Sequence, residues 1–106
     1  MIIGRPCKDV SPSEALSYVL GYTLTNDVSS RKRMFAFPGI QWGLGKSFDG
    51  HLPIGPVLVS RDALGNPEDV QLRTEVNGEV MQDGNTRDHL WGVAETIAEL
   101  SQVSRT

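Results

Sequence analysis

The residues with chemical potential lie in one segment, residues 21–56, among glycines, prolines and aromatic side chains. They include a carboxylate at Asp27, a Lys-Ser pair at Lys46 and Ser47, and a histidine at His51. Polar groups placed between turn residues and aromatic side chains are typical of a loop region that carries a binding or catalytic site. Nucleotide binding, nucleophilic hydrolysis and metal-assisted catalysis are the chemistries to compare.

Residues 43–47, with the sequence GLGKS, resemble the end of a phosphate-binding loop. That motif needs a glycine five residues before the Gly-Lys step, and this position holds Ile40, with Gly39 one residue away. The loop must also open a helix, whereas residues 48–53 contain Gly50 and Pro53. The spacing therefore excludes a nucleotide-binding loop.

The two histidines do not predict a hydrolytic triad. His51 and His89 are present, but the chain contains no G-x-S-x-G sequence that would expose a serine nucleophile. We interpret both histidines as surface or packing residues.

Asp27 lies near the end of an alternating segment, where carboxylates often bind metal ions. On spacing alone, a metal ligand and a hydrogen-bonded structural aspartate are equally good interpretations. Lys46 could pair with this carboxylate or stabilise a developing oxyanion, and the alternative is a surface lysine.

The 106-residue length and the charge of −3 limit the class of protein. We expect one globular domain over residues 1–106, with no attraction for nucleic acid or for anionic membranes. The basic triplet at residues 31–33 fits a solvated turn, and the single Cys7 excludes an internal disulfide. The chain shows no signal peptide or apolar span, so we expect a cytoplasmic protein, with a mitochondrial location as the alternative.

Hydrophobic spacing predicts an α+β protein with a mixed or antiparallel sheet. Residues 1–3 look like the end of a buried strand, so we expect the sequence to begin inside a domain. Residues 41–50 contain too many glycines for a helix, residues 34–39 and 64–68 form irregular connections, and Thr86 caps a helical turn. The remaining predicted elements are helices over 12–20 and 91–102, strands over 22–28 and 57–60, and a hairpin over 70–83 turning at Asn77-Gly78, with Val70, Leu72, Thr74 and Val76 facing inward.

Three segments together resemble the fumarylacetoacetate hydrolase family: GYTLTNDVSSR at 21–31, QWGLGKSFDGHLPIGP at 41–56 and VNGEVMQDGNT at 76–86. The resemblance spans residues 3–101. It implies a mixed β-roll of the fumarylacetoacetase C-terminal-domain type, a homodimer and a Mg²⁺ ion, or Mn²⁺ or Ca²⁺ in its place. It also implies hydrolysis, decarboxylation or isomerisation of small oxo-acids such as acylpyruvates, oxaloacetate and diketo acids.

The same resemblance assigns roles to three residues. It implies that Asp27 is a metal ligand, that Arg31 contacts a substrate carboxylate, and that Lys46 polarises the oxo oxygen or stabilises an enolate. These roles agree with the chemistry, because a guanidinium matches a carboxylate and a cation stabilises the charge that develops beside a carbonyl.

The chain departs from the family pattern in three places. It has no Glu-x-Glu pair, no Thr-Gly-Thr-Pro loop, and Met34 where the family usually has glutamine. We therefore expect a domain truncated at both ends that binds metal weakly and has little or no activity by itself. The alternative is a non-catalytic module that associates with itself or with a partner protein.

Overall fold

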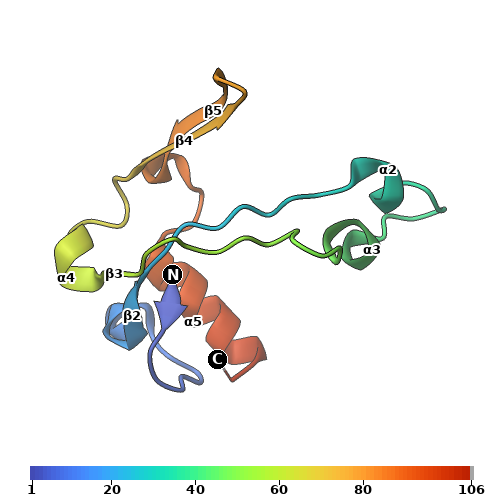
Figure 1. Cartoon of the computed structure of the whole chain (residues 1–106). Helices are drawn as coiled ribbons and strands as arrows, with labels where there is room; N and C mark the ends of the chain where they lie inside the picture. The colour runs from blue at the N-terminus through green and yellow to red at the C-terminus, as the bar shows by residue number, and fades with distance from the viewer. Residues whose placement is uncertain (106) are drawn as a thin grey trace. The chain divides into compact units, whose positions relative to one another are not determined.

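Three short strands form an antiparallel sheet with the order β1 (Ile2–Ile3), β2 (Val19–Tyr22) and β3 (Val59–Ser60). This computed structural model describes residues 1–105 (Figure 1). The chain divides into a larger unit, made of residues 1–22 and the chain from residue 59 onward, and a smaller unit, Thr23–Leu58. The strand predicted at the N-terminus is confirmed, and β3 is shorter than its predicted range.

The predicted helix over residues 12–20 is wrong in its second half. The helix α1 (Pro12–Ala15) continues only as a 3-10 turn, η1 (Leu16–Tyr18), and β2 follows at once. Val19 and Leu20 have helical spacing, but pairing with β1 and β3 recruits them into the sheet, so tertiary contacts override the local pattern. The capping box is also incomplete, since Ser11 Oγ donates to Glu14 Oε2 at 2.7 Å and caps no backbone N–H.

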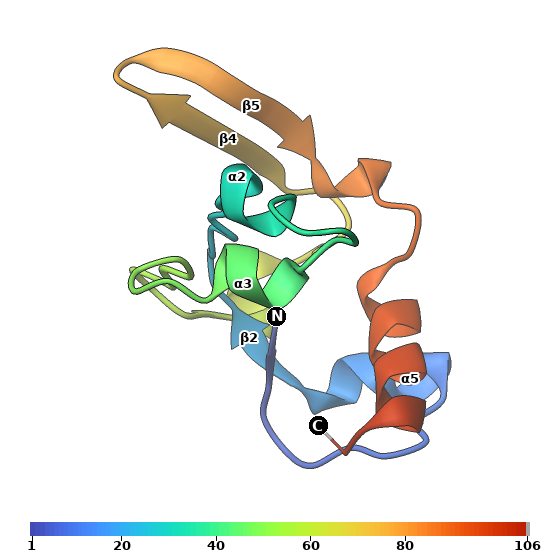
Figure 2. The same cartoon turned by 90° about the vertical axis from the view of Figure 1, so that its right-hand side faces the viewer.

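The C-terminal helix α5 (Val93–Val103) covers the N-terminal segment and α1 in the larger unit, as Figure 2 shows. This helix confirms the amphipathic pattern predicted for residues 91–102. Its first turn is held by Glu68, whose Oε1 accepts the Val93 N–H at 2.7 Å.

Among residues 1–105, none of the helices has the length and apolar character needed to cross a bilayer. The core of the larger unit, between α5 and the N-terminal segment, consists of Cys7, Val10, Ala15, Val19 and Ile97.

Ser101 ties the N-terminal segment to α5 and is fully buried. Its Oγ accepts the Val10 N–H at 3.0 Å and donates to the Ala98 carbonyl at 2.8 Å, while its own carbonyl accepts the Asp9 N–H at 3.1 Å. A buried hydroxyl such as that of Ser101 stabilises the fold only while both of its hydrogen bonds are made.

Replacing Ser101 by alanine is expected to destabilise the larger unit by about 1–3 kcal/mol, because the Val10 N–H is left buried without an acceptor. Urea unfolding followed by far-UV circular dichroism measures the change. Ser104→Ala, at an exposed position just after the helix, is the matched control and should change the unfolding free energy by less than about 0.5 kcal/mol. Equal effects of the two substitutions would contradict this assignment.

The hairpin of β4 (Gln71–Val76) and β5 (Glu79–Asn85) confirms the turn prediction. Asn77 and Gly78 have φ values of 53° and 83°, the left-handed conformations that a type I′ turn requires. The predicted inward face is confirmed only in part, since Val70 and Thr74 are half-buried whereas Leu72 and Val76 are 39% and 52% exposed. Among the described residues the sheet has only the two strands β4 and β5, so no further element of the sheet buries its apolar side chains. The alternation of apolar and polar residues predicts a strand but does not supply a surface that covers one face.

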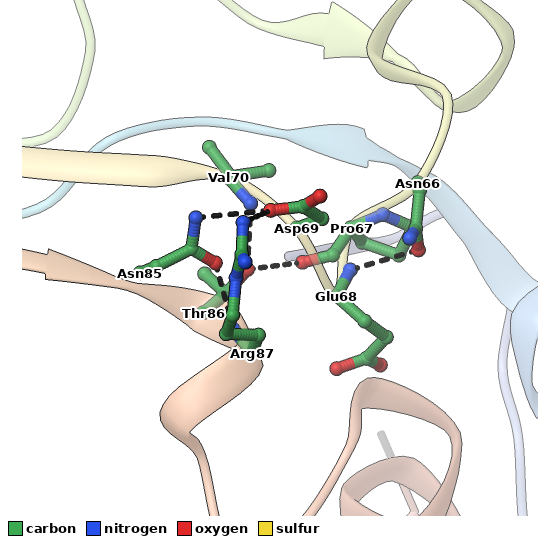
Figure 3. Close-up of polar contacts among 8 residues, drawn as sticks. All are labelled: Asn66, Pro67, Glu68, Asp69, Val70, Asn85, Thr86 and Arg87. Atoms are coloured by element: carbon green, nitrogen blue, oxygen red, sulfur yellow. Dashed lines mark hydrogen bonds and ion pairs between the residues drawn. The ribbon is translucent and has the colours of Figure 1, made fainter.

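A polar network closes the base of this hairpin (Figure 3). Asp69 Oδ1 accepts hydrogen bonds from Asn85 and Arg87, and these bonds lower the pKa of the Asp69 carboxyl. Thr86 Oγ1 accepts the Val70 N–H at 2.9 Å and donates to Pro67. The cap of the 3-10 turn η2 (Thr86–Asp88) is Asn85, which corrects the prediction of Thr86.

A further short helix, α4 (Arg61–Leu64), follows β3 directly. Ser60 begins it by accepting the Ala63 N–H at its Oγ, with a distance of 3.3 Å. The loop predicted for residues 64–68 therefore starts one residue later, at Gly65, whose φ of 77° ends the helix.

Candidate functional site

Two extended arms, residues 23–28 and 51–57, run antiparallel through the smaller unit (Figure 1). Backbone bonds join them from Gly55 N to Leu24 O at 3.0 Å and from Val28 N to His51 O at 3.0 Å. The strand predicted over residues 22–28 is wrong as a continuous ladder, since Thr25 and Ile54 form one isolated bridge. Pro53 and Pro56 have no N–H to donate, which interrupts regular pairing.

Two short helices, α2 (Arg31–Met34) and α3 (Trp42–Lys46), follow the first arm and precede the second. The helix α3 contradicts the prediction that residues 41–50 hold too many glycines to be helical. Gly45 is buried against α2, where an added Cβ would lie 2.9 Å from Met34 Cβ. The packing between the two helices therefore requires a glycine at a position where propensity disfavours one.

Asp27 and Lys46 meet in an ion pair between the first arm and the end of α3. Lys46 Nζ donates to Asp27 Oδ2, and the two side chains are 32% (Lys46) and 59% (Asp27) exposed. Because both charges remain in contact with solvent, the pair contributes little to stability. It places a cation and a carboxylate together at a solvent-exposed position.

Arg31 begins α2 with an exposed side chain, four residues after Asp27. Within residues 1–105, no hydrogen bond or ion pair joins it to Asp27 or Lys46. The structure thus brings two of the three predicted site residues, Asp27 and Lys46, into contact. The guanidinium of the third, Arg31, remains available to an anion.

His51 is half-buried, and its ring lies against Phe48 with centroids 5.0 Å apart. Its Nδ1 is buried and has no hydrogen-bond partner within the described part of the chain. His89 is exposed. These placements agree with the interpretation of His51 as a packing residue and of His89 as a surface residue.

Sequence reasoning missed the role of Met34. The sequence marks Met34 only as a departure from a glutamine, whereas in the structure it is 4% exposed and its Cβ and Cε pack over Gly45. Its signal in the sequence is weak, because Met34 begins a run of four apolar residues, 34–37, that shows no helical or strand periodicity.

The described residues do not by themselves fit a Mg²⁺ ion. Residues 1–105 contain no group of three or more His, Cys, Asp or Glu side chains that could hold a metal. Asp27 is a single carboxylate that already carries the Lys46 ammonium, whereas Mg²⁺ needs several oxygen ligands.

Residues 1–105 match the family described as fumarylacetoacetate hydrolase, C-terminal. Over 102 residues the chain is 44% identical to 2,4-didehydro-3-deoxy-L-rhamnonate hydrolase of a Sphingomonas species, a match of 96% of this chain and 35% of that protein. The solved structure of fumarylacetoacetate hydrolase from Exiguobacterium antarcticum superposes with a TM-score of 0.88 at 39% identity, over 99% of this chain and 37% of that one.

A third similar structure is fumarylpyruvate hydrolase from Pseudomonas aeruginosa, in complex with Mn²⁺ and pyruvate. It superposes with a TM-score of 0.79 at 31% identity, over 97% of this chain and 45% of that one. The chain spans about a third of the length of the curated relatives that it matches.

Proposed function

Because the chain belongs to the fumarylacetoacetate hydrolase family, we propose that its Asp27, Arg31 and Lys46 form one wall of a site for small oxo-acids. The reaction class is cleavage, decarboxylation or isomerisation beside a carbonyl, through an enolate. The observation that carries this proposal is the solvent-accessible Lys46–Asp27 pair in the same unit as an uncommitted Arg31.

Lys46 supplies the charge that an enolate needs. Breaking a bond next to a carbonyl places negative charge on the oxo oxygen, and an ammonium already in place lowers the energy of that state. Asp27 keeps the ammonium oriented before substrate binds. A direct charge-assisted hydrogen bond from Lys46 to the oxo oxygen would then form at little cost in side-chain entropy.

Arg31 is suited to hold the substrate's carboxylate. A planar guanidinium binds a carboxylate through two parallel N–H bonds, which fixes orientation as well as position. The exposed Arg31 side chain at the start of α2 has no competing ion pair within residues 1–105. Its role is therefore binding and alignment of the oxo-acid.

Asp27 would contribute one oxygen ligand to a divalent cation. A lone carboxylate paired with an ammonium is a weak metal site, so we expect the 106-residue chain to bind Mg²⁺ or Mn²⁺ with a dissociation constant of about 1 mM or weaker. Little or no turnover of oxaloacetate or acylpyruvates is expected from this chain alone.

Isothermal titration with Mn²⁺, alongside an oxaloacetate and acylpyruvate assay, tests both expectations. Asp27→Asn should remove the remaining heat of binding, while Asp49→Asn, at an exposed carboxylate in the same unit, should not. Micromolar Mn²⁺ binding or clear turnover by the chain would contradict the expectation of a weak site.

A second candidate function is a non-catalytic module that self-associates. The observation that favours it is the β4–β5 hairpin, a two-stranded sheet with unpaired outer edges in the described chain and with Val76 and Met81 52% and 59% exposed. Sedimentation velocity over a range of concentrations, with and without Mn²⁺, separates the two proposals when it is combined with an oxo-acid titration. A stable oligomer that is indifferent to metal and binds no oxo-acid would favour the module.

A further inference from the structure

We infer that Gly45 and Met34 are positioning residues that set Lys46 on Asp27, an inference that rests on the proposed oxo-acid site. Gly45 has no side chain, and the Met34 side chain forms no hydrogen bond or ion pair with Lys46 or Asp27. Their contact fixes the backbone from which Lys46 extends, so they act through the lysine.

The contact between the two helices leaves no room for a side chain at position 45. A Cβ built on Gly45 would lie 2.9 Å from Met34 Cβ, 3.0 Å from Met34 Cε and 3.4 Å from Met34 Cα. Two of these atoms belong to the start of the side chain and to the backbone, which cannot rotate away. Any side chain at position 45 therefore forces α3 away from α2.

Backbone bonds transmit this constraint to the ion pair. The Gly45 carbonyl accepts the N–H of Ser30, which lies three residues after Asp27, at 2.8 Å. The Gly45 N–H donates to Gln41 O at 3.2 Å. Met34 O in turn accepts the Gln41 N–H at 3.0 Å. The position of Lys46 relative to Asp27 is thus set at Gly45, the residue that immediately precedes the lysine.

The same helix provides a matched control. Gly43 lies two residues before Gly45 in α3, and a Cβ added there would meet nothing within 4 Å. Gly43→Ala and Gly45→Ala make the same chemical change with the same effect on helix propensity. They differ in the contact with Met34.

Competitive acylation of the three lysines, read by peptide mass spectrometry, tests the inference without metal or turnover. A lysine Nζ that is in contact with a carboxylate is less accessible to the reagent than a free one, so Lys46 should react about two- to fivefold more slowly than exposed Lys32. Asp27→Asn should bring Lys46 to the rate of Lys32. Lys8, which donates to Gln102 O in the larger unit, reports whether that unit stays folded.

Gly45→Ala is expected to raise the Lys46 rate to that of the Asp27→Asn protein, whereas Gly43→Ala leaves it unchanged. Where Gly45→Ala unfolds the smaller unit, Met34→Ala gives a second route, since it removes the packing beyond Cβ and should raise the rate part of the way. An unchanged Lys46 rate in folded Gly45→Ala or Met34→Ala protein, or an equal rise in Gly43→Ala, overturns the inference.

Titration of these proteins and of Lys46→Met with oxalate, a planar dianion that resembles the enolate of an oxo-acid, separates this inference from the proposed function. Acylation that responds to Gly45→Ala, with oxalate binding that ignores Lys46, would support positioning and contradict the oxo-acid site. Oxalate binding that requires Lys46, with acylation indifferent to position 45, would support the site and contradict positioning.

Discussion

Replacing Lys46 by methionine is expected to weaken the binding of oxalate, a planar dianion that mimics the enolate of pyruvate, by about 10- to 100-fold. A hydrogen bond to a charged group contributes about 1.5–3 kcal/mol, and each 1.4 kcal/mol is a tenfold change in affinity. Methionine keeps the length and apolar stem of lysine but cannot stabilise the oxyanion. Isothermal titration with oxalate measures the loss.

Lys32→Met is the matched control for this substitution. Lys32 lies in α2, in the same unit, and is exposed without an ion pair within residues 1–105. It carries the same charge, so its loss changes the long-range field equally but removes no contact with the ligand. We expect less than about a twofold change in oxalate affinity. Equal losses in the two proteins would show that oxalate senses net charge, and Lys46 would lose its assigned role.

Truncating Ile97 to alanine is expected to destabilise the larger unit by about 2–5 kcal/mol. Ile97 is 2% exposed and lies in the core that joins α5 to the N-terminal segment and β2. A core of this size supports a total stability of only about 3–5 kcal/mol, so the truncation should remove most of the stability of this unit. Urea titration of the far-UV circular dichroism signal and hydrogen exchange of the α5 amides measure the effect.

Val103→Ala is the control, because Val103 lies in the same helix but is exposed. Val103 is 81% exposed at the last position of α5, and the same truncation of a branched side chain there should cost less than about 0.5 kcal/mol. If Ile97→Ala unfolds at the same urea concentration as Val103→Ala, the α5 contact is not the core of this unit.

Local patterns predicted the elements that depend on a few neighbouring residues. Asn77-Gly78 between alternating segments defines the hairpin because both residues tolerate positive φ. The spacing of Val93, Ala94, Ile97 and Ala98 defines an amphipathic helix. The motifs around Asp27 and Lys46 were sufficient to predict the family, which the match over residues 1–105 confirms. The β-roll, the dimer and the metal remain predictions.

Patterns failed where a distant segment decides the conformation. Val19 and Leu20 have the spacing of a helix but begin β2, since β1 and β3 offer this segment backbone partners. Gly43 and Gly45 argued against a helix, yet α3 forms because Gly45 fits against Met34. In both places the tertiary contact outweighs a propensity difference of about 1 kcal/mol or less per residue.

The sequence by itself determined the family and the identity of the candidate site residues, because residue type and order are preserved in a linear motif. Only the tertiary structure decided that Asp27 and Lys46, 19 residues apart, meet in an ion pair while Arg31 stays exposed. The physical reason is steric. The distance between those two charges depends on how closely α2 and α3 approach, and the contact of Gly45 with Met34 sets that approach.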